Sequence, residues 1–184
     1  MSDQPCTEER FKIVIIDMAQ LIRKIVVYVN SKGYKTKLTP QTIDLGTVAL
    51  NGFSGKKLTH EFVKRSYKIA PGCETDTYWD KAREKNEDFL HQNLSILFGE
   101  LSMDLVQDFS DIMKLKDDKG KYVVVDETRE SIWEFLQALI KISIRFVHET
   151  RKPELIDGKK QYTVEYFSEI SVSKQVTLWK IKSI

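Results

Sequence analysis

The segment Ile132–Pro153, IWEFLQALIKISIRFVHETRKP, constrains the fold of this chain more than any other feature. Apolar residues cover most of the circumference of the helix that this segment would form. A helix of that kind must be covered by other helices on several sides. The sequence therefore predicts a bundle with this helix at its centre, beginning after Asp126 and ending at Pro153.

Other parts of the chain show the spacing of three and four residues between apolar side chains that is typical of amphipathic helices. Thr39-Pro40 is a helix cap followed by proline at the first helical position, and Thr77 with Asp80 resembles a capping box. These patterns predict helices over residues 7–30, 41–50, 58–69, 77–98 and 102–115.

The C-terminal part of the chain has a different pattern. Asp157-Gly158 is a hairpin signal, and β-type residues alternate with polar residues on its C-terminal side. We therefore expect a mainly α fold, a helical bundle around a long central C-terminal helix, with a small antiparallel β element at about 122–125, 161–167 and 175–182. Residues 1–184 are expected to form a single domain, with 154–184 as a β-containing appendage.

Composition is typical of a soluble globular protein, with 41% hydrophobic and 30% charged residues. Charged residues interrupt the apolar segment Phe11–Val29, so we expect no transmembrane segment. The first ten residues are polar, so we also expect no signal peptide. The two cysteines, Cys6 and Cys73, are expected to be free thiols in an intracellular, reducing compartment.

Basic residues are concentrated between residues 32 and 72, where the chain has eight basic residues and only two acidic ones. Four interpretations remain open: a solvated surface, packing against the acidic region 73–134 of the same chain, a docking surface for an acidic protein or subunit, or a surface that binds a phosphate backbone. The phosphate-binding interpretation is weaker because only one of the eight is arginine, which recognises phosphates and bases better than lysine does. The candidate binding surface comprises Lys32, Lys35, Lys37, Lys56, Lys57, Lys64, Arg65 and Lys68.

Sequence signatures of catalysis and metal binding are missing. The chain has no zinc-protease, nucleophile-elbow, P-loop or dinucleotide-binding pattern. Its three histidines, His60, His91 and His148, do not have the spacing of metal ligands. We therefore expect no enzyme, no cofactor and no metal site.

Two aromatic residues suggest a second kind of contact. Tyr166 and Trp179 fall in the predicted C-terminal strands, where few core partners are evident. An aromatic side chain on an edge strand can recruit another chain. The alternative is that both side chains pack over the helical core.

Three segments resemble small helical proteins encoded by nucleocytoplasmic large DNA viruses. These segments are YWDKAREKNEDFL at Tyr78–Leu90, FGEL at Phe98–Leu101, and the long apolar segment that ends in HETRKP. An N-terminal Phe11-Lys12 followed by Asp17 extends the resemblance to about half of the chain. The resemblance implies a virion-associated or infection-associated protein without enzymatic activity, and it implies no catalytic residue.

Together, these observations predict a non-enzymatic viral structural or virion-associated protein that acts by surface docking, in the host cytoplasm or the virion. A protein partner or a viral assembly is the expected partner. The first alternative is a nucleic-acid-binding accessory protein that uses the basic 32–68 region. The second is a helix-binding regulatory bundle, which requires a hydrophobic groove on its surface. The oligomeric state stays open.

Overall fold

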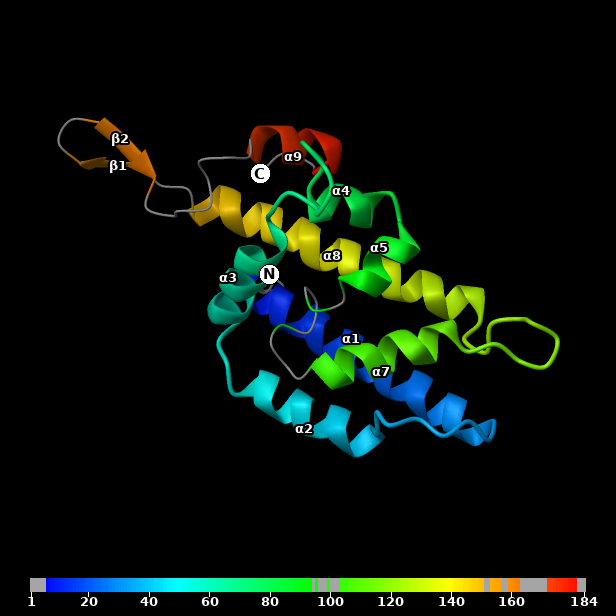
Figure 1. Cartoon of the computed structure of the whole chain (residues 1–184). Coiled ribbons are helices and arrows are strands. Elements are labelled where there is room, and N and C mark those ends of the chain that lie inside the picture. Colours follow the sequence, from blue (N-terminus) through cyan, green and yellow to red (C-terminus); the bar gives the residue numbers. More distant parts are fainter. Residues whose placement is uncertain are drawn as a thin grey trace.

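The protein is a mainly α-helical bundle (Figure 1). The computed structural model describes residues 6–93, 95, 99, 103–150, 153–156, 159–162 and 172–181. Its helices are α1 (Thr7–Ser31), α2 (Pro40–Asn51), α3 (Gly55–Ser66), α4 (Tyr78–Arg83), α5 (Glu87–Gln92), α7 (Met103–Lys114), α8 (Asp126–Thr150) and α9 (Val172–Leu178). Two short strands, β1 (Pro153–Ile156) and β2 (Lys159–Tyr162), lie between α8 and α9.

The predicted central helix is α8, which spans 25 residues. It packs against α1, α3, α4 and α9, so neighbouring helices cover it on several sides. Leu139 and Ile144 are completely buried, and Ser143 between them is buried as well. The prediction of a long helix in the middle of a bundle is confirmed.

The first helix, α1, is as long as α8 and runs in roughly the opposite direction (Figure 1). Its buried residues are Phe11, Met18, Ile22, Ile25, Val26 and Val29. Their spacing of three, four and seven residues places them on one stripe that faces the core. Because α1 also packs against α2 and α3, it connects the central helix to the N-terminal half of the bundle.

The N-terminus of α3 lies directly against the first turn of α1. A Cβ atom added at Gly55 would lie 2.2 Å from the carbonyl oxygen of Glu8, so a larger residue would force the two helices apart. The aromatic rings of Phe11 and Phe62 pack nearby, with centroids 5.4 Å apart. This close approach fixes the position of α3 on the bundle.

The predicted helix caps are present. The side chain of Thr39 accepts a hydrogen bond from the backbone N–H of Thr42, with Pro40 as the first helical residue. Thr77 and Asp80 form a reciprocal capping box at the start of α4. These local signals located the beginnings of α2 and α4 correctly.

The predicted continuous helix over 77–98 is wrong. The chain leaves helical geometry after α4, with Lys85 at a φ of 54°, and α5 begins at Glu87. The side chain of Asn86 accepts a hydrogen bond from the N–H of Phe89 and so caps the new helix. A cap residue inside the helical pattern therefore divides it at Asn86, between α4 and α5.

Two of the three predicted strands do not form. Tyr122 makes only an isolated bridge to Lys116, and Val123 and Val124 are buried in the loop before α8. Residues 172–178, which overlap the strand predicted at 175–182, form helix α9.

The antiparallel pair in the structure is β1 with β2, which pairs Pro153 with Tyr162 and flanks Asp157-Gly158. It overlaps the strand predicted at 161–167 only at residues 161 and 162. Residues 163–167 lie outside the described residues.

Candidate functional site

The eight predicted basic residues lie in two groups at opposite ends of α2. Lys32, Lys35 and Lys37 are in the loop that joins α1 to α2, and they are exposed. The second group lies on α3 or directly after it: Lys56, Lys57, Lys64, Arg65 and Lys68. Since α2 has 12 residues, its axis separates the groups by about 18 Å. The fold does not join them into one continuous surface.

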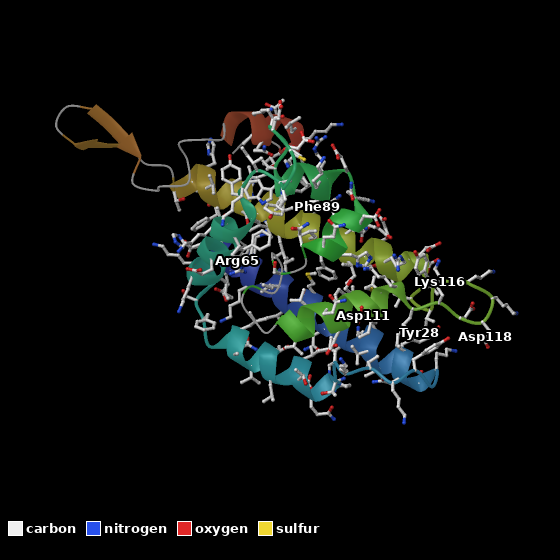
Figure 2. The ribbon with its side chains drawn as sticks, in the orientation of Figure 1. Tyr28, Arg65, Phe89, Asp111, Lys116 and Asp118 are labelled. Carbon is white, nitrogen blue, oxygen red and sulfur yellow. The ribbon has the colours of Figure 1, made fainter. Side chains whose placement is uncertain are left out.

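The loop group shares one end of the bundle with the α7–α8 loop (Figure 2). There the ammonium group of Lys32 lies 5.3 Å from the ring centroid of Tyr28. Lys116 lies over Tyr122 in the same way, at 5.0 Å. These lysines are therefore partly engaged by aromatic faces of the same chain.

The α3 group lies at the other end of the bundle, where Figure 2 labels Arg65. Lys56, Lys57, Lys64 and Lys68 are exposed, whereas Arg65 is half-buried beside Gly99. The ammonium group of Lys57 lies 4.4 Å from the ring centroid of Phe53. This group borders an apolar hollow between α1, α2 and α3.

That hollow is a pocket of about 310 Å³ between α1, α2 and α3, which we call the α2 pocket. Its walls are almost entirely apolar: α1 contributes Ile15, Met18 and Ile22, and α2 contributes Ile43, Gly46 and Leu50. A pocket of this volume is at the lower end of the range found for ligand sites in proteins.

The floor and one end of the α2 pocket have different chemistry. Leu139 of the central helix and Leu105 of α7 lie on the bundle side. The α3 end contains Lys57, Glu61 and Arg65, and each is four residues, about one helical turn, from the next. The pocket therefore combines an apolar interior with charged side chains at one end, where its lining includes the exposed Lys57.

Helix α2 forms the outer wall of the pocket, packs against α1 and makes two polar contacts with it. Nε of Arg23 lies 2.7 Å from Oδ1 of Asp44, and this hydrogen bond raises the pKa of Arg23. Nζ of Lys12 donates a hydrogen bond of 3.0 Å to the carbonyl oxygen of Asn51. Both contacts involve partly or fully exposed side chains, so they are partly hydrated.

Few residues of α2 are buried. Thr47 is its only buried residue, and the hydroxyl group of Thr47 donates to the carbonyl oxygen of Ile43 in the same helix. Leu45 and Val48 are 73% and 69% exposed on the outer side. A helix with apolar residues on two sides and little burial is an unusual wall for a closed core.

Sequence reasoning missed the α2 pocket. The available signal was the composition of α2, whose apolar residues Ile43, Leu45, Val48 and Leu50 do not fall on one face. Gly46 inside this helix was a second signal, because a glycine leaves space where a side chain would pack. A Cβ atom there would meet nothing within 4 Å.

The predicted docking role of Trp179 is wrong. Trp179 follows α9 and is only 6% exposed, as part of the hydrophobic core. Packing over the helical core, the alternative interpretation, therefore holds for this residue. Tyr166 lies outside the described residues.

His91 is the one histidine with a clearly shifted pKa among the described residues. Partial burial, together with the charge of Lys114, lowers that pKa below its usual value of 6.5. Nδ1 of His91 lies 3.2 Å from the hydroxyl oxygen of Ser110. Ser110 is 2% exposed, and the adjoining cavity holds only about 10 Å³. The contact is therefore a structural link between α5 and α7.

The described residues include no group of three or more side chains that could hold a metal ion. Both cysteines are free thiols, with Cys6 exposed and Cys73 half-buried. No described helix has the length and apolar character needed to span a membrane.

The fold and the pocket define a helical bundle with an apolar surface pocket that has a charged end. Comparison of the chain with protein-family models, curated proteins and solved structures finds no match.

Proposed function

We propose that this protein is a non-enzymatic interaction protein that binds an apolar segment of a partner protein in the α2 pocket. The observation that carries the proposal is the pocket itself, with about 310 Å³ of mainly apolar space open to the surface. Exposed apolar hollows of this kind mark interaction sites, because leaving them in contact with water costs free energy. This function combines the predicted surface docking with the hydrophobic groove that a helix-binding bundle requires.

The viral part of the prediction belongs to the same proposal. If the resemblance to proteins of large DNA viruses reflects common ancestry, the partner is another virion-associated or infection-associated protein. The docking mode proposed for the α2 pocket is the same whichever organism supplies the partner.

Nucleic-acid binding is the weaker candidate. The eight basic residues that motivated it are divided into two groups about 18 Å apart along α2. Each group has fewer phosphate contacts to offer than the intact set, and counterion release scales with that number. The apolar pocket has no role in this candidate function.

Peptide-display selection tests the proposed function directly. The bait is the full chain, and each round is counter-selected against the variant Gly46→Phe. Because Gly46 lines the pocket and has open space in front of it, a phenylalanine ring can fill the pocket. The matched control is Gly46→Ala, which changes the same position and leaves most of the space free.

We expect the selection to enrich apolar peptides that bind the wild-type chain and Gly46→Ala but not Gly46→Phe. Circular dichroism and thermal unfolding of each variant verify that all three chains are folded. Enriched peptides that bind Gly46→Phe as tightly as the wild-type chain would overturn the proposal, and so would a selection without enrichment.

A further inference from the structure

We infer that the segment bound in the α2 pocket is an acidic amphipathic helix, with its apolar face in the pocket and its carboxylates toward α3. This inference rests on the proposed function and specifies the partner. It depends on three properties of the pocket: the hydrogen-bonding state of its walls, its length, and the charge at its α3 end.

The walls of the pocket favour a helix over an extended segment. They are formed by α1, α2 and α3, whose peptide groups are bonded within each helix. Thr47, a polar residue of the α2 wall, already donates its hydroxyl proton to Ile43. An extended segment would bury peptide N–H and C=O groups here without partners, which is costly, whereas a helix satisfies its own.

The length of the pocket suits about two turns of helix. Along α2 it extends from Thr42 to Leu50, which is about 12 Å at 1.5 Å per residue. Side chains at positions i, i+3, i+4 and i+7 of a bound helix span about 10.5 Å. One apolar face of a short helix therefore matches the pocket from end to end.

The charge at the α3 end selects an acidic partner. Helix α3 carries four basic residues, Lys56, Lys57, Lys64 and Arg65, and Glu61 is its only acidic residue. On the α2 side, Asp44 is paired with Arg23. A helix with carboxylates flanking its apolar face gains attraction from α3, whereas a helix with lysines there is repelled.

The test uses two synthetic helices of about 14 residues that share leucines at the i, i+3, i+4 and i+7 positions. One peptide has glutamate and the other has lysine at the positions flanking the leucines. Each is labelled, and fluorescence anisotropy is measured with the full chain at low and high salt. The protein variants are Gly46→Phe, the double charge reversal Lys57→Glu with Lys64→Glu, and the control Lys119→Glu.

We expect the acidic peptide to bind about three- to ten-fold more tightly than the basic one at low salt, and this preference to shrink as salt increases. Gly46→Phe should abolish binding of both peptides. The double charge reversal should invert the preference, because α3 then carries excess negative charge. Lys119→Glu changes an exposed lysine in the α7–α8 loop, and it should leave the preference unchanged.

Three outcomes would overturn the inference and separate it from the proposed function. Equal binding of both peptides, sensitive to Gly46→Phe, would remove the acidic partner and leave docking intact. Failure of both peptides, with a successful display selection, would remove the helical partner. Competition by a fatty acid that is stronger than that of the acidic peptide would assign the pocket to a lipid.

Discussion

Arg129 of α8 and Glu87 of α5 form an ion pair, with Nη2 of the guanidinium group 2.7 Å from Oε2 of the carboxylate. The arginine side chain is only 7% exposed, whereas the glutamate side chain is 43% exposed. Nη1 of the same arginine donates to the carbonyl oxygen of Met113 at the end of α7. One buried side chain therefore connects three helices near the start of the central helix.

Removing the glutamate should destabilise the fold, because a buried guanidinium group is left with one partner fewer. We expect Glu87→Ala to lower the free energy of unfolding by about 1–3 kcal/mol, at the lower end because the carboxylate is partly hydrated. Urea unfolding measures this change. Glu130→Ala is the control, since its ion pair with Lys85 is exposed and should contribute less than about 1 kcal/mol. Equal effects of the two variants would contradict the structural role of Arg129.

Gly46 offers a prediction about stability that does not depend on any partner. It lies inside α2, and a Cβ atom at this position would meet nothing within 4 Å. Gly46→Ala should therefore stabilise the protein by about 0.5–1 kcal/mol through helix propensity. Thermal unfolding gives the sign of the effect.

Gly55→Ala is the matched control, because the same change places Cβ 2.2 Å from the carbonyl oxygen of Glu8. It should destabilise the protein as α1 and α3 are pushed apart. A destabilised Gly46→Ala variant would mean that the space in front of Gly46 is smaller than described.

Trp179 should behave as a core residue. Its ring is 6% exposed, and its indole nitrogen has no hydrogen-bond partner among the described residues. We expect Trp179→Ala to lower the free energy of unfolding by about 3–5 kcal/mol. Trp179→Phe should cost much less, because it retains most of the apolar ring and loses no hydrogen bond. Chemical denaturation of both variants tests this, and a neutral Trp179→Ala would restore an exposed docking role.

His91 should make stability depend on pH. Partial burial lowers the pKa of His91 in the folded state, so the unfolded chain binds the proton more readily. Its contribution to stability is therefore complete above about pH 6.5 and is lost as the pH falls through the folded-state pKa.

We expect the free energy of unfolding to decline less steeply below about pH 6.5 in His91→Gln than in the wild-type chain. Urea unfolding at a series of pH values measures the slope. His148→Gln, a change at an exposed position on α8, is the control. An unchanged slope in His91→Gln would contradict the assignment.

Helices with local start signals were predictable from the sequence. Thr39-Pro40 and the Thr77–Asp80 box fix backbone geometry within a few residues, and the period of apolar residues in α1 and α8 determines which side is buried. The break at Lys85 was harder to predict, because Asn86 is compatible with both a helix interior and a helix cap.

The C-terminal helix and the pocket depend on tertiary contacts. Alternation around Val176 and Leu178 indicated a strand, but this segment packs against α8 as helix α9. Gln175 in the helix and Trp179 directly after it are both buried. The α2 pocket is lined by residues of α1, α2, α3, α7 and α8, so it depends on how helices distant in the sequence pack together.

Ionic strength should act on the outer wall of the α2 pocket and not, by screening, on its floor. Its floor belongs to the hydrophobic core through Leu139, and apolar contacts there do not depend on a Coulomb attraction that dissolved ions could screen. In its outer wall, Asp44 of α2 forms an ion pair with Arg23 of α1, and both side chains are more than one-third exposed. Salt screens such a pair, so a rise in ionic strength should weaken this one link of α2 to α1 by no more than about 1 kcal/mol, while the apolar packing of α2 against α1 remains.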